Sequence, residues 1–151
     1  MTPQLDNNIY EHVKLLCANG DSLADRKEFN LALEKYQEAL RLVPEPSFKW
    51  EASTWIFTAI GDAHFLSGNF NEAYSAFSSA AACPGGIGNP FIHLRLGEIQ
   101  FELGNELLAA DELARAYMSA GKNIFAGEPE KYFSLLKKKL RMPEGDSEYG
   151  N

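Results

Sequence analysis

Cysteine is nearly absent from this chain of 151 residues, which contains only Cys17 and Cys83. Two cysteines are too few for the disulfide framework that holds small secreted domains together, so we expect both to be small buried apolar residues. No apolar run approaches the roughly 18 residues that indicate a membrane-spanning helix. The start of the sequence also lacks the basic and apolar pattern of a signal peptide. We therefore expect a cytoplasmic protein that does not associate with a membrane.

Positive charge is scarce, because 14 lysines and arginines face 21 aspartates and glutamates, which gives a formal net charge of −7. Proteins that bind DNA or RNA duplexes need a basic surface that replaces the counterions of the phosphates, so nucleic acid is not an expected partner. An acidic chain attracts basic partners instead. The hydrophobic content of 45% indicates a folded chain rather than a disordered one.

Motifs for catalysis or metal binding are also missing. The three histidines, His12, His64 and His93, do not have a metal-ligand spacing such as H-E-x-x-H. The glycine-rich stretch PGGIGNP lacks the Lys-Ser/Thr pair of a phosphate-binding loop, and we interpret it as a flexible link between two segments. No G-x-S-x-G motif occurs, and neither cysteine has an obvious histidine base. The sequence thus predicts no enzymatic activity, no cofactor and no metal. We expect His64 to pack between helices.

What the sequence does contain is a repeated spacing of small residues. Three segments begin near Val13, Thr54 and Pro90, and each has a glycine as its eighth residue. An alanine follows twelve residues later, a large apolar or aromatic residue four further on, and a second alanine three after that. These residues are Gly20, Ala32, Tyr36 and Ala39 in the first segment, Gly61, Ala73, Phe77 and Ala80 in the second, and Gly97, Ala109, Leu113 and Ala116 in the third. Small residues at these steps let two antiparallel helices approach closely.

This pattern resembles the tetratricopeptide repeat (TPR) family, whose unit of 34 residues has the same order of Gly, Ala, aromatic, Ala and Pro. The resemblance implies an all-α fold of three helix-turn-helix units, about 13–44, 54–85 and 90–121, stacked as a right-handed superhelix. Asn19, His64 and Gln100 depart from the family pattern, and the closing proline is clear only at Pro44. The first two units are offset by 41 residues, so the connection between them is longer than usual.

About seven helices follow from this alignment. We expect them at 6–26, 29–42, 48–67, 70–82, 90–103, 106–119 and 128–141, with tight turns at Asn30, at 69–71 and at 104–105. The long connection predicts that the first helix of the second unit begins early, near Phe48.

A stack of repeats exposes an apolar flank at its end, which a terminal helix must cover. The last predicted helix suits this role, because Pro129 fits a first turn and apolar residues follow at helical steps. These are Tyr132, Phe133, Leu135, Leu136 and Leu140, whereas 137–139 is a lysine run that we expect to face solvent. We expect residues 1–143 to form a single domain and 144–151 to be a disordered tail.

In TPR proteins the first helix of each unit lines a concave groove. The family positions carry over to nine candidate partner-binding residues: Asp21, Asp25, Trp55, Asp62, Phe65, Phe91, Glu98, Phe101 and Glu102. Aromatic residues are typical anchors of interfaces, so acids between them indicate a groove for a basic segment that carries apolar side chains. Two alternatives remain open: these residues are ordinary solvated or packing residues, or binding uses another surface, such as the helix near Trp50.

One familiar ligand class is disfavoured by the same positions. TPR proteins that bind the tails of Hsp70 and Hsp90 hold a terminal carboxylate with lysine, asparagine and arginine side chains. The corresponding residues here are Cys17, Asp21, Ala59, Phe91 and Arg95. Only Arg95 matches, and Asp21 would repel the carboxylate.

Size, charge and repeat count resemble two bacterial classes. One is the immunity protein that binds and blocks a cognate toxin, and the other is the chaperone of type III secretion translocators. The idiosyncratic connection favours one dedicated partner, and hence an immunity protein that occludes a basic surface of a toxin. A secretion chaperone and a generic scaffold are the alternatives. Homo-oligomerisation through an uncovered end, such as the 6–26 helix, remains open.

Overall fold

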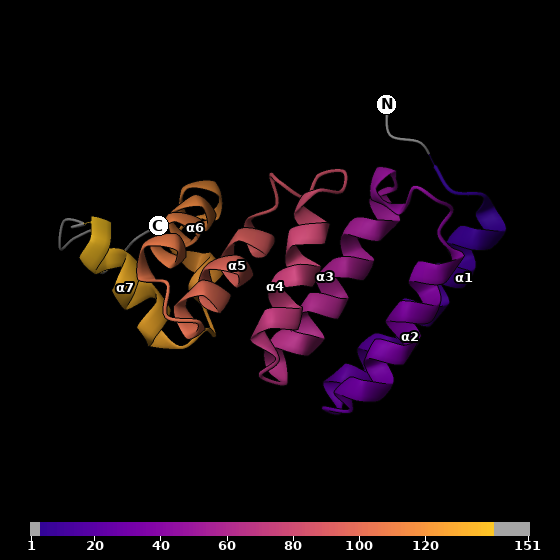
Figure 1. Ribbon diagram of the computed structural model, residues 1–151, viewed down its shortest axis with the longest axis horizontal. Helices are drawn as coiled ribbons and strands as arrows, with labels where there is room; N and C mark the ends of the chain where they lie inside the picture. Colours follow the sequence, from indigo (N-terminus) through magenta and orange to yellow (C-terminus); the bar gives the residue numbers. More distant parts are fainter. Residues whose placement is uncertain (1–3, 141–151) are drawn as a thin grey trace. The chain divides into compact units, whose positions relative to one another are not determined.

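A computed structural model describes residues 4–140, and α-helices dominate this range (Figure 1). The chain forms two compact units, one ending at Ile87 and the other beginning at Gly88, and each is described by itself. Within the described range the α-helices are α1 (Asn7–Asp25), α2 (Phe29–Leu42), α3 (Glu51–Leu66), α4 (Phe70–Ala81), α5 (Pro90–Glu102), α6 (Glu106–Ala120) and α7 (Glu130–Leu140). Two short 3-10 helices, η1 (Ser47–Lys49) and η2 (Lys122–Phe125), complete the order. The predicted all-α fold of helix-turn-helix units is confirmed.

The first unit consists of two helical hairpins, α1–α2 and α3–α4, with α2 packed against α3. Each hairpin closes tightly where its repeat glycine meets the large residue of the partner helix. A Cβ atom on Gly20 would lie 2.5 Å from the Tyr36 ring, and one on Gly61 would lie 2.7 Å from the Phe77 ring. The repeat alanines are all fully buried at 0% exposure, namely Ala32, Ala39, Ala73 and Ala80. The spacing of small residues therefore has the packing role that the sequence predicts.

The turns inside the two hairpins have the same backbone conformation. Lys27 (φ 63°) and Gly68 (φ 83°) both adopt the left-handed conformation that commonly ends a helix. The next residue's N–H then bonds back to the carbonyl five residues earlier, 2.9 Å from Glu28 to Leu23 in the first hairpin. The prediction that Asn30 marks the first turn is wrong: it is the second residue of α2, since the turn closes at Lys27.

The connection between the hairpins does not extend α3 as the sequence predicts. Phe48 lies in η1, and Trp50 has an extended backbone (φ −105°, ψ 134°) that separates η1 from α3. The Trp50 indole N–H donates a 2.8 Å hydrogen bond to the carbonyl of Pro44 and thereby holds the connection in a loop. Helix α3 consequently begins at Glu51, three residues later than expected.

The glycine-rich stretch that follows α4 packs onto the end of that helix. The Thr54 hydroxyl donates a 2.7 Å hydrogen bond to the carbonyl of Pro84, and the Gly86 N–H donates to the carbonyl of Cys83 at 2.9 Å. A Cβ atom on Gly86 would clash with the backbone of Ala80. Glycine at this position is therefore required by close packing of the backbone.

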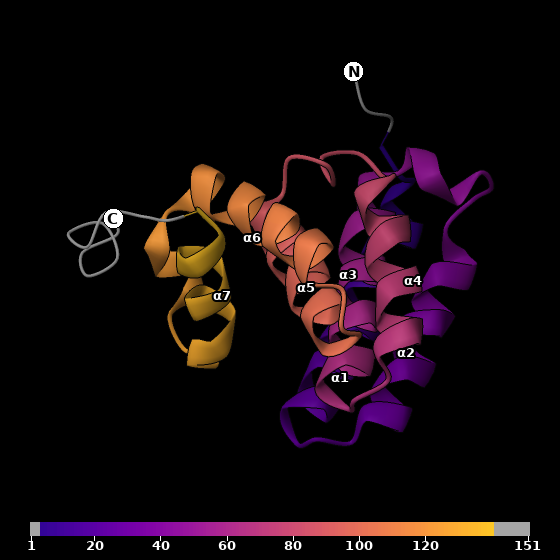
Figure 2. The ribbon, with the colours of Figure 1, turned by 60° about the vertical axis from the view of Figure 1, so that its left-hand side comes forward.

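The second unit contains one repeat hairpin, α5–α6, with η2 and α7 packed beside it (Figure 2). A Cβ atom on Gly97 would lie 2.7 Å from the Leu113 side chain, which repeats the contact seen twice in the first unit. Helix α5 starts with Pro90, and the Asn89 side chain caps it by accepting a 2.9 Å hydrogen bond from the N–H of Phe91.

Helix α7 covers the apolar flank of this hairpin, as the sequence predicts. It begins at Glu130 rather than at residue 128, and its side chains Tyr132, Phe133, Leu135 and Leu136 are buried. Leu140 is 47% exposed, so its predicted place on the buried face is wrong; it lies in the last turn of α7. The expected helix end at 141 and the tail 144–151 fall outside the described residues. The single domain over 1–143 stays a prediction.

Candidate partner-binding face

Helices α1 and α3, the first helices of two repeats, contact each other in the first unit. We call the exposed surface that carries Asp21, Asp25, Trp55 and Asp62 the α1–α3 face. The Tyr36 hydroxyl reaches it from α2 and donates a 2.6 Å hydrogen bond to Asp21. Burial raises the pKa of Tyr36, and the charges of Asp21 and Asp62 raise it further. The structure thus brings the acids of two repeats close to one hydroxyl.

The cysteines of the first unit are poor nucleophiles. Cys17 is half-buried, and burial together with the charge of Asp21 raises the pKa of its thiol to about 11. Cys83 is buried, and burial raises the pKa of its thiol as well. Since the thiolate is the reactive form, neither thiol is reactive at neutral pH. The predicted burial is confirmed for Cys83, whereas Cys17 is only half-buried.

The two aromatic candidates of α3 have different surroundings. Phe65 is half-buried and packs edge-on against Phe70 of its own hairpin, with ring centroids 5.7 Å apart. Trp55 packs edge-on against Tyr10 of α1, with centroids 6.1 Å apart. Tyr10 was not among the sequence-predicted residues, although it lies on the same helical stripe as Lys14, one turn before the first repeat.

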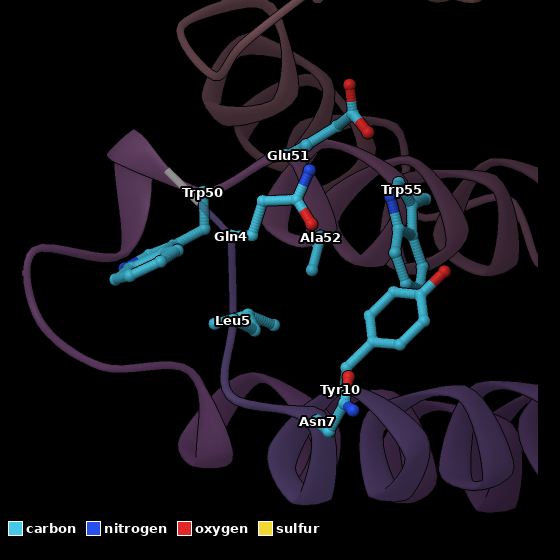
Figure 3. Close-up of a pocket in the computed structure, with 8 residues that line it drawn as sticks. All are labelled: Gln4, Leu5, Asn7, Tyr10, Trp50, Glu51, Ala52 and Trp55. Carbon is cyan, nitrogen blue, oxygen red and sulfur yellow. The ribbon is translucent and has the colours of Figure 1, made fainter. Parts of the chain in front are cut away.

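Trp55 also lines a cavity of about 450 Å³ at the N-terminal ends of α1 and α3, which we call the Trp55 pocket (Figure 3). Its described lining residues are Gln4, Leu5, Asn7, Tyr10, Trp50, Glu51, Ala52 and Trp55. Figure 3 shows the Tyr10 and Trp55 rings along one side and Trp50 on the opposite side, with Glu51 at the edge. Sequence reasoning missed most of this pocket, because its residues come from the segments before each repeat.

The candidates of the third repeat lie against the chain's own C-terminal segment. Glu102 accepts a 2.6 Å hydrogen bond from the Tyr132 hydroxyl and pairs with Lys131 at 2.7 Å. Burial opposes ionisation of Glu102, but the hydrogen bonds from Lys131 and Tyr132 prevail and lower its pKa. Phe101 packs edge-on against Tyr132, with centroids 5.2 Å apart. These contacts tie the end of α5 to α7.

Glu98 is fully buried rather than exposed on a groove. Its carboxyl group pairs with Arg95 at 2.7 Å, and Arg95 also pairs with Glu128 at 2.8 Å. Burial and the neighbouring Glu128 raise the pKa of Glu98 to about 8, against the opposing charge of Arg95. The Arg95 guanidinium lies 4.9 Å from the centre of the Phe91 ring. In this structure Glu98 is not available to a partner, whereas the role of the other eight candidates stays a prediction.

The remaining chemistry is sparse in residues 4–140. This range contains no group of three or more His, Cys, Asp or Glu side chains that could hold a metal ion. His93 pairs with Glu112 at 2.7 Å. His64 is half-buried and lines a hollow together with residues of α2 and α4. None of the helices described here is long and apolar enough to cross a membrane.

Comparison with known proteins gives matches among solved structures alone, since neither a protein-family model nor a curated protein matches the sequence. The type III secretion chaperone SycD of Yersinia enterocolitica, in complex with a peptide of the translocator YopD, is 18% identical with a TM-score of 0.69. The alignment covers 87% of this chain and 95% of that chain.

The TPR domain of Arabidopsis OM64 is 17% identical, with a TM-score of 0.68 and coverage of 89% and 99% of the two chains. The chain has the tetratricopeptide repeat fold. A third TPR structure agrees, the first TPR of Spaghetti (RPAP3) bound to the HSP90 peptide SRMEEVD. It is 16% identical, with a TM-score of 0.67 and coverage of 87% and 92%. At these identities the likeness concerns the fold alone.

Proposed function

We propose that this chain is a protein-interaction module that holds an extended basic segment of a protein partner on the α1–α3 face. The observation that carries the proposal is the juxtaposition on one face of exposed carboxylates and an aromatic-lined cavity. Asp21 and Asp25 are exposed, Asp62 is half-buried beside them, and the Trp55 pocket lies on the same two helices. Charge of one sign beside an aromatic anchor suits a segment of opposite charge.

Peptide ligands are also found on similar folds. The SycD structure contains a peptide of the translocator YopD, and the RPAP3 structure contains a peptide of HSP90. The first case supports a chaperone that holds a segment of a client protein, which is the form of the proposal that we favour. None of the structures described above supports the toxin-immunity interpretation, which becomes an outcome of the test.

A clamp for a terminal carboxylate does not suit these residues. Asp21 occupies one of the clamp positions, and its carboxylate already accepts a hydrogen bond from the Tyr36 hydroxyl. Arg95, the one matching residue, is only 8% exposed and is paired with Glu98 and Glu128. The acidic tail of the HSP90 peptide is therefore not the kind of ligand that we propose here.

The proposal is tested by capturing partners from the native cell with three tagged forms of the protein. These are the wild type, the Asp21→Lys/Asp25→Lys variant, and a Glu34→Lys/Glu38→Lys control that makes the same charge change on exposed positions of α2. We expect the wild type and the control to retain the same partner, and the α1–α3 variant to lose it. Retention by all three, with helical circular dichroism unchanged, would contradict the proposal.

The captured partner also distinguishes the kinds of interaction. A client chaperone keeps an otherwise unfolded client soluble and binds a short segment excised from it. An immunity protein binds a folded toxin and blocks its activity, and a scaffold holds two partners at once. High salt should weaken the complex in each case if the carboxylates carry it.

A further inference from the structure

We propose that the Trp55 pocket receives an arginine side chain of the partner's segment. This inference rests on the proposed function, because the pocket lies at one end of the α1–α3 face. It goes beyond that function by assigning the chemistry of one contact. A cavity of about 450 Å³ has room for one large side chain and part of its backbone.

The walls of the pocket suit the flat part of such a side chain. Trp55 is half-buried and is held by the edge-on contact with Tyr10, which is itself 38% exposed. Leu5 and Ala52 add apolar surface between the aromatic side chains (Figure 3). The aliphatic stem and planar head of arginine stack on such surfaces.

The rim of the pocket supplies acceptors for the charged head. Glu51 is exposed and is the one acidic or basic residue among the lining residues that the structure describes. The side-chain amides of Gln4 and Asn7 provide two more oxygen acceptors. A guanidinium group can bind a carboxylate through two parallel hydrogen bonds while its plane lies against an indole.

The aromatic rings of the pocket already attract cations from within the chain. The Lys14 ammonium lies 5.1 Å from the centre of the Tyr10 ring, and the Lys49 ammonium lies 5.7 Å from that of Trp50. Both distances are within the range of cation–π interactions. These rings therefore have faces that bind cations, and an arginine guest would take the place of a lysine side chain there.

Other guests fit less well. An acidic side chain would face Glu51 and the net charge of −7. The N-terminal ends of α1 and α3 attract anions, but an acid of the chain stands at each of them, Asp6 at the N-cap position of α1 without a side-chain capping bond and Glu51 in the first turn of α3. A purely apolar side chain would take water from Glu51 without giving it a hydrogen bond, which costs free energy.

The pocket has a built-in spectroscopic probe, because the chain contains two tryptophans and both line it. Two indole N–H signals in a proton–nitrogen NMR spectrum therefore report on this site and on no other tryptophan. The Trp50 indole N–H donates to Pro44, whereas Trp55 packs against Tyr10, so the two signals distinguish the two sides of the pocket.

The experiment titrates the full chain with the blocked tripeptide acetyl-Gly-Arg-Gly-amide. The control peptide has citrulline in place of arginine, which keeps the shape and removes the charge. We expect a saturable shift of the Trp55 indole signal with the arginine peptide, and at least about threefold weaker binding of the citrulline peptide. Glu51→Gln should weaken the binding of the arginine peptide about threefold and leave the binding of the citrulline peptide unchanged. Glu34→Gln on α2 should change the affinity for neither peptide.

Three outcomes would overturn the inference: equal binding of the two peptides, no effect of Glu51→Gln, or no saturable shift up to the solubility limit of the arginine peptide. If one occurs while Asp21→Lys/Asp25→Lys still loses the partner, only the pocket assignment fails. If the tripeptide binds as expected but that variant keeps the partner, the proposed function fails instead.

Discussion

The first and third repeats place acids at the same two repeat positions but in different surroundings. In the first repeat, Asp21 and Asp25 are exposed on α1. In the third repeat, Glu98 is fully buried with Arg95 and Glu128, and Glu102 is tied to Tyr132. The repeat spacing is the same in both, so the difference comes from the segment that follows the repeats. The C-terminal segment of the second unit uses the acids of its own repeat as structural contacts.

Because of this difference, the acids of the α1–α3 face are the better candidates for partner binding. An acid that holds α7 in place contributes to the stability of the second unit, whereas an acid in water on the α1–α3 face can contribute to binding. Substitutions at equivalent positions should therefore affect stability in one unit and affinity in the other.

The largest expected effect comes from breaking the buried cluster of the second unit. Arg95→Met should lower the free energy of unfolding by about 3 kcal/mol or more, because it leaves Glu98 and Glu128 facing each other without their cation. Urea unfolding followed by circular dichroism measures this. A loss below about 1 kcal/mol, within the range of an ordinary surface change, would be inconsistent with the cluster described here.

The same cluster makes stability depend on pH. Since the pKa of Glu98 is raised from 4.5 to about 8, the folded chain holds a proton over that range that the unfolded chain has released. The free energy of unfolding should therefore fall as the pH rises from about 5 to 8, by up to roughly 1 kcal/mol per pH unit through this group. Above pH 8 this contribution no longer changes.

Denaturation curves at a series of pH values measure this effect. Glu98→Gln does not titrate, so its stability should change less over the same range. Asp21→Asn on the exposed face is the matched control and should keep the slope of the wild type. Parallel pH profiles for the wild type and Glu98→Gln would contradict the raised pKa.

Two tyrosine–carboxylate pairs allow a closer comparison of the units. Tyr36 donates to Asp21 in the first unit, and Tyr132 donates to Glu102 in the second, both at 2.6 Å. Removing either hydroxyl with Tyr→Phe should cost about 1–2 kcal/mol, since a hydrogen bond to a charged group is lost. Tyr36→Phe should also weaken partner binding by changing the position of Asp21, and Tyr132→Phe should not. Equal effects of the two substitutions on partner binding would contradict the assignment of binding to the first unit.

The sequence predicts the hairpins well, because Gly20, Gly61 and Gly97 each face the expected large residue. It also predicts that the last helix covers the third repeat, but it does not predict that Glu98 and Glu102 are held by the C-terminal segment, since no repeat spacing encodes contacts such as that of Tyr132 with Glu102. The Trp55 pocket was missed because Tyr10 and Trp50 lie outside the repeat positions. The helix expected at Phe48 was wrong because the extended Trp50 interrupts it.

The smallest effect compares the turns of the repeats. Lys27 has the left-handed conformation (φ 63°) that glycine supplies at Gly68 and Gly104 in the other two. Lys27→Gly should raise the free energy of unfolding by about 0.5–1 kcal/mol, because glycine adopts this conformation without strain. Lys27→Ala, which keeps the Cβ atom, is the control and should give no gain. Equal stabilities of the two variants would show that the turn is not strained.

We propose that the carboxylates of the α1–α3 face bind a basic segment of a partner. A charge-swap titration with the captured partner, in which one basic residue of its bound segment is changed to glutamate, tests this binding. We expect the Asp21→Lys/Asp25→Lys protein to bind the unchanged partner tenfold or more weakly, a loss of about 1.4 kcal/mol. The same variant should bind the glutamate form of the partner more tightly than the wild-type protein does. The Glu34→Lys/Glu38→Lys protein should behave like the wild type. Unchanged affinity of the α1–α3 variant for both forms of the partner would contradict the claim.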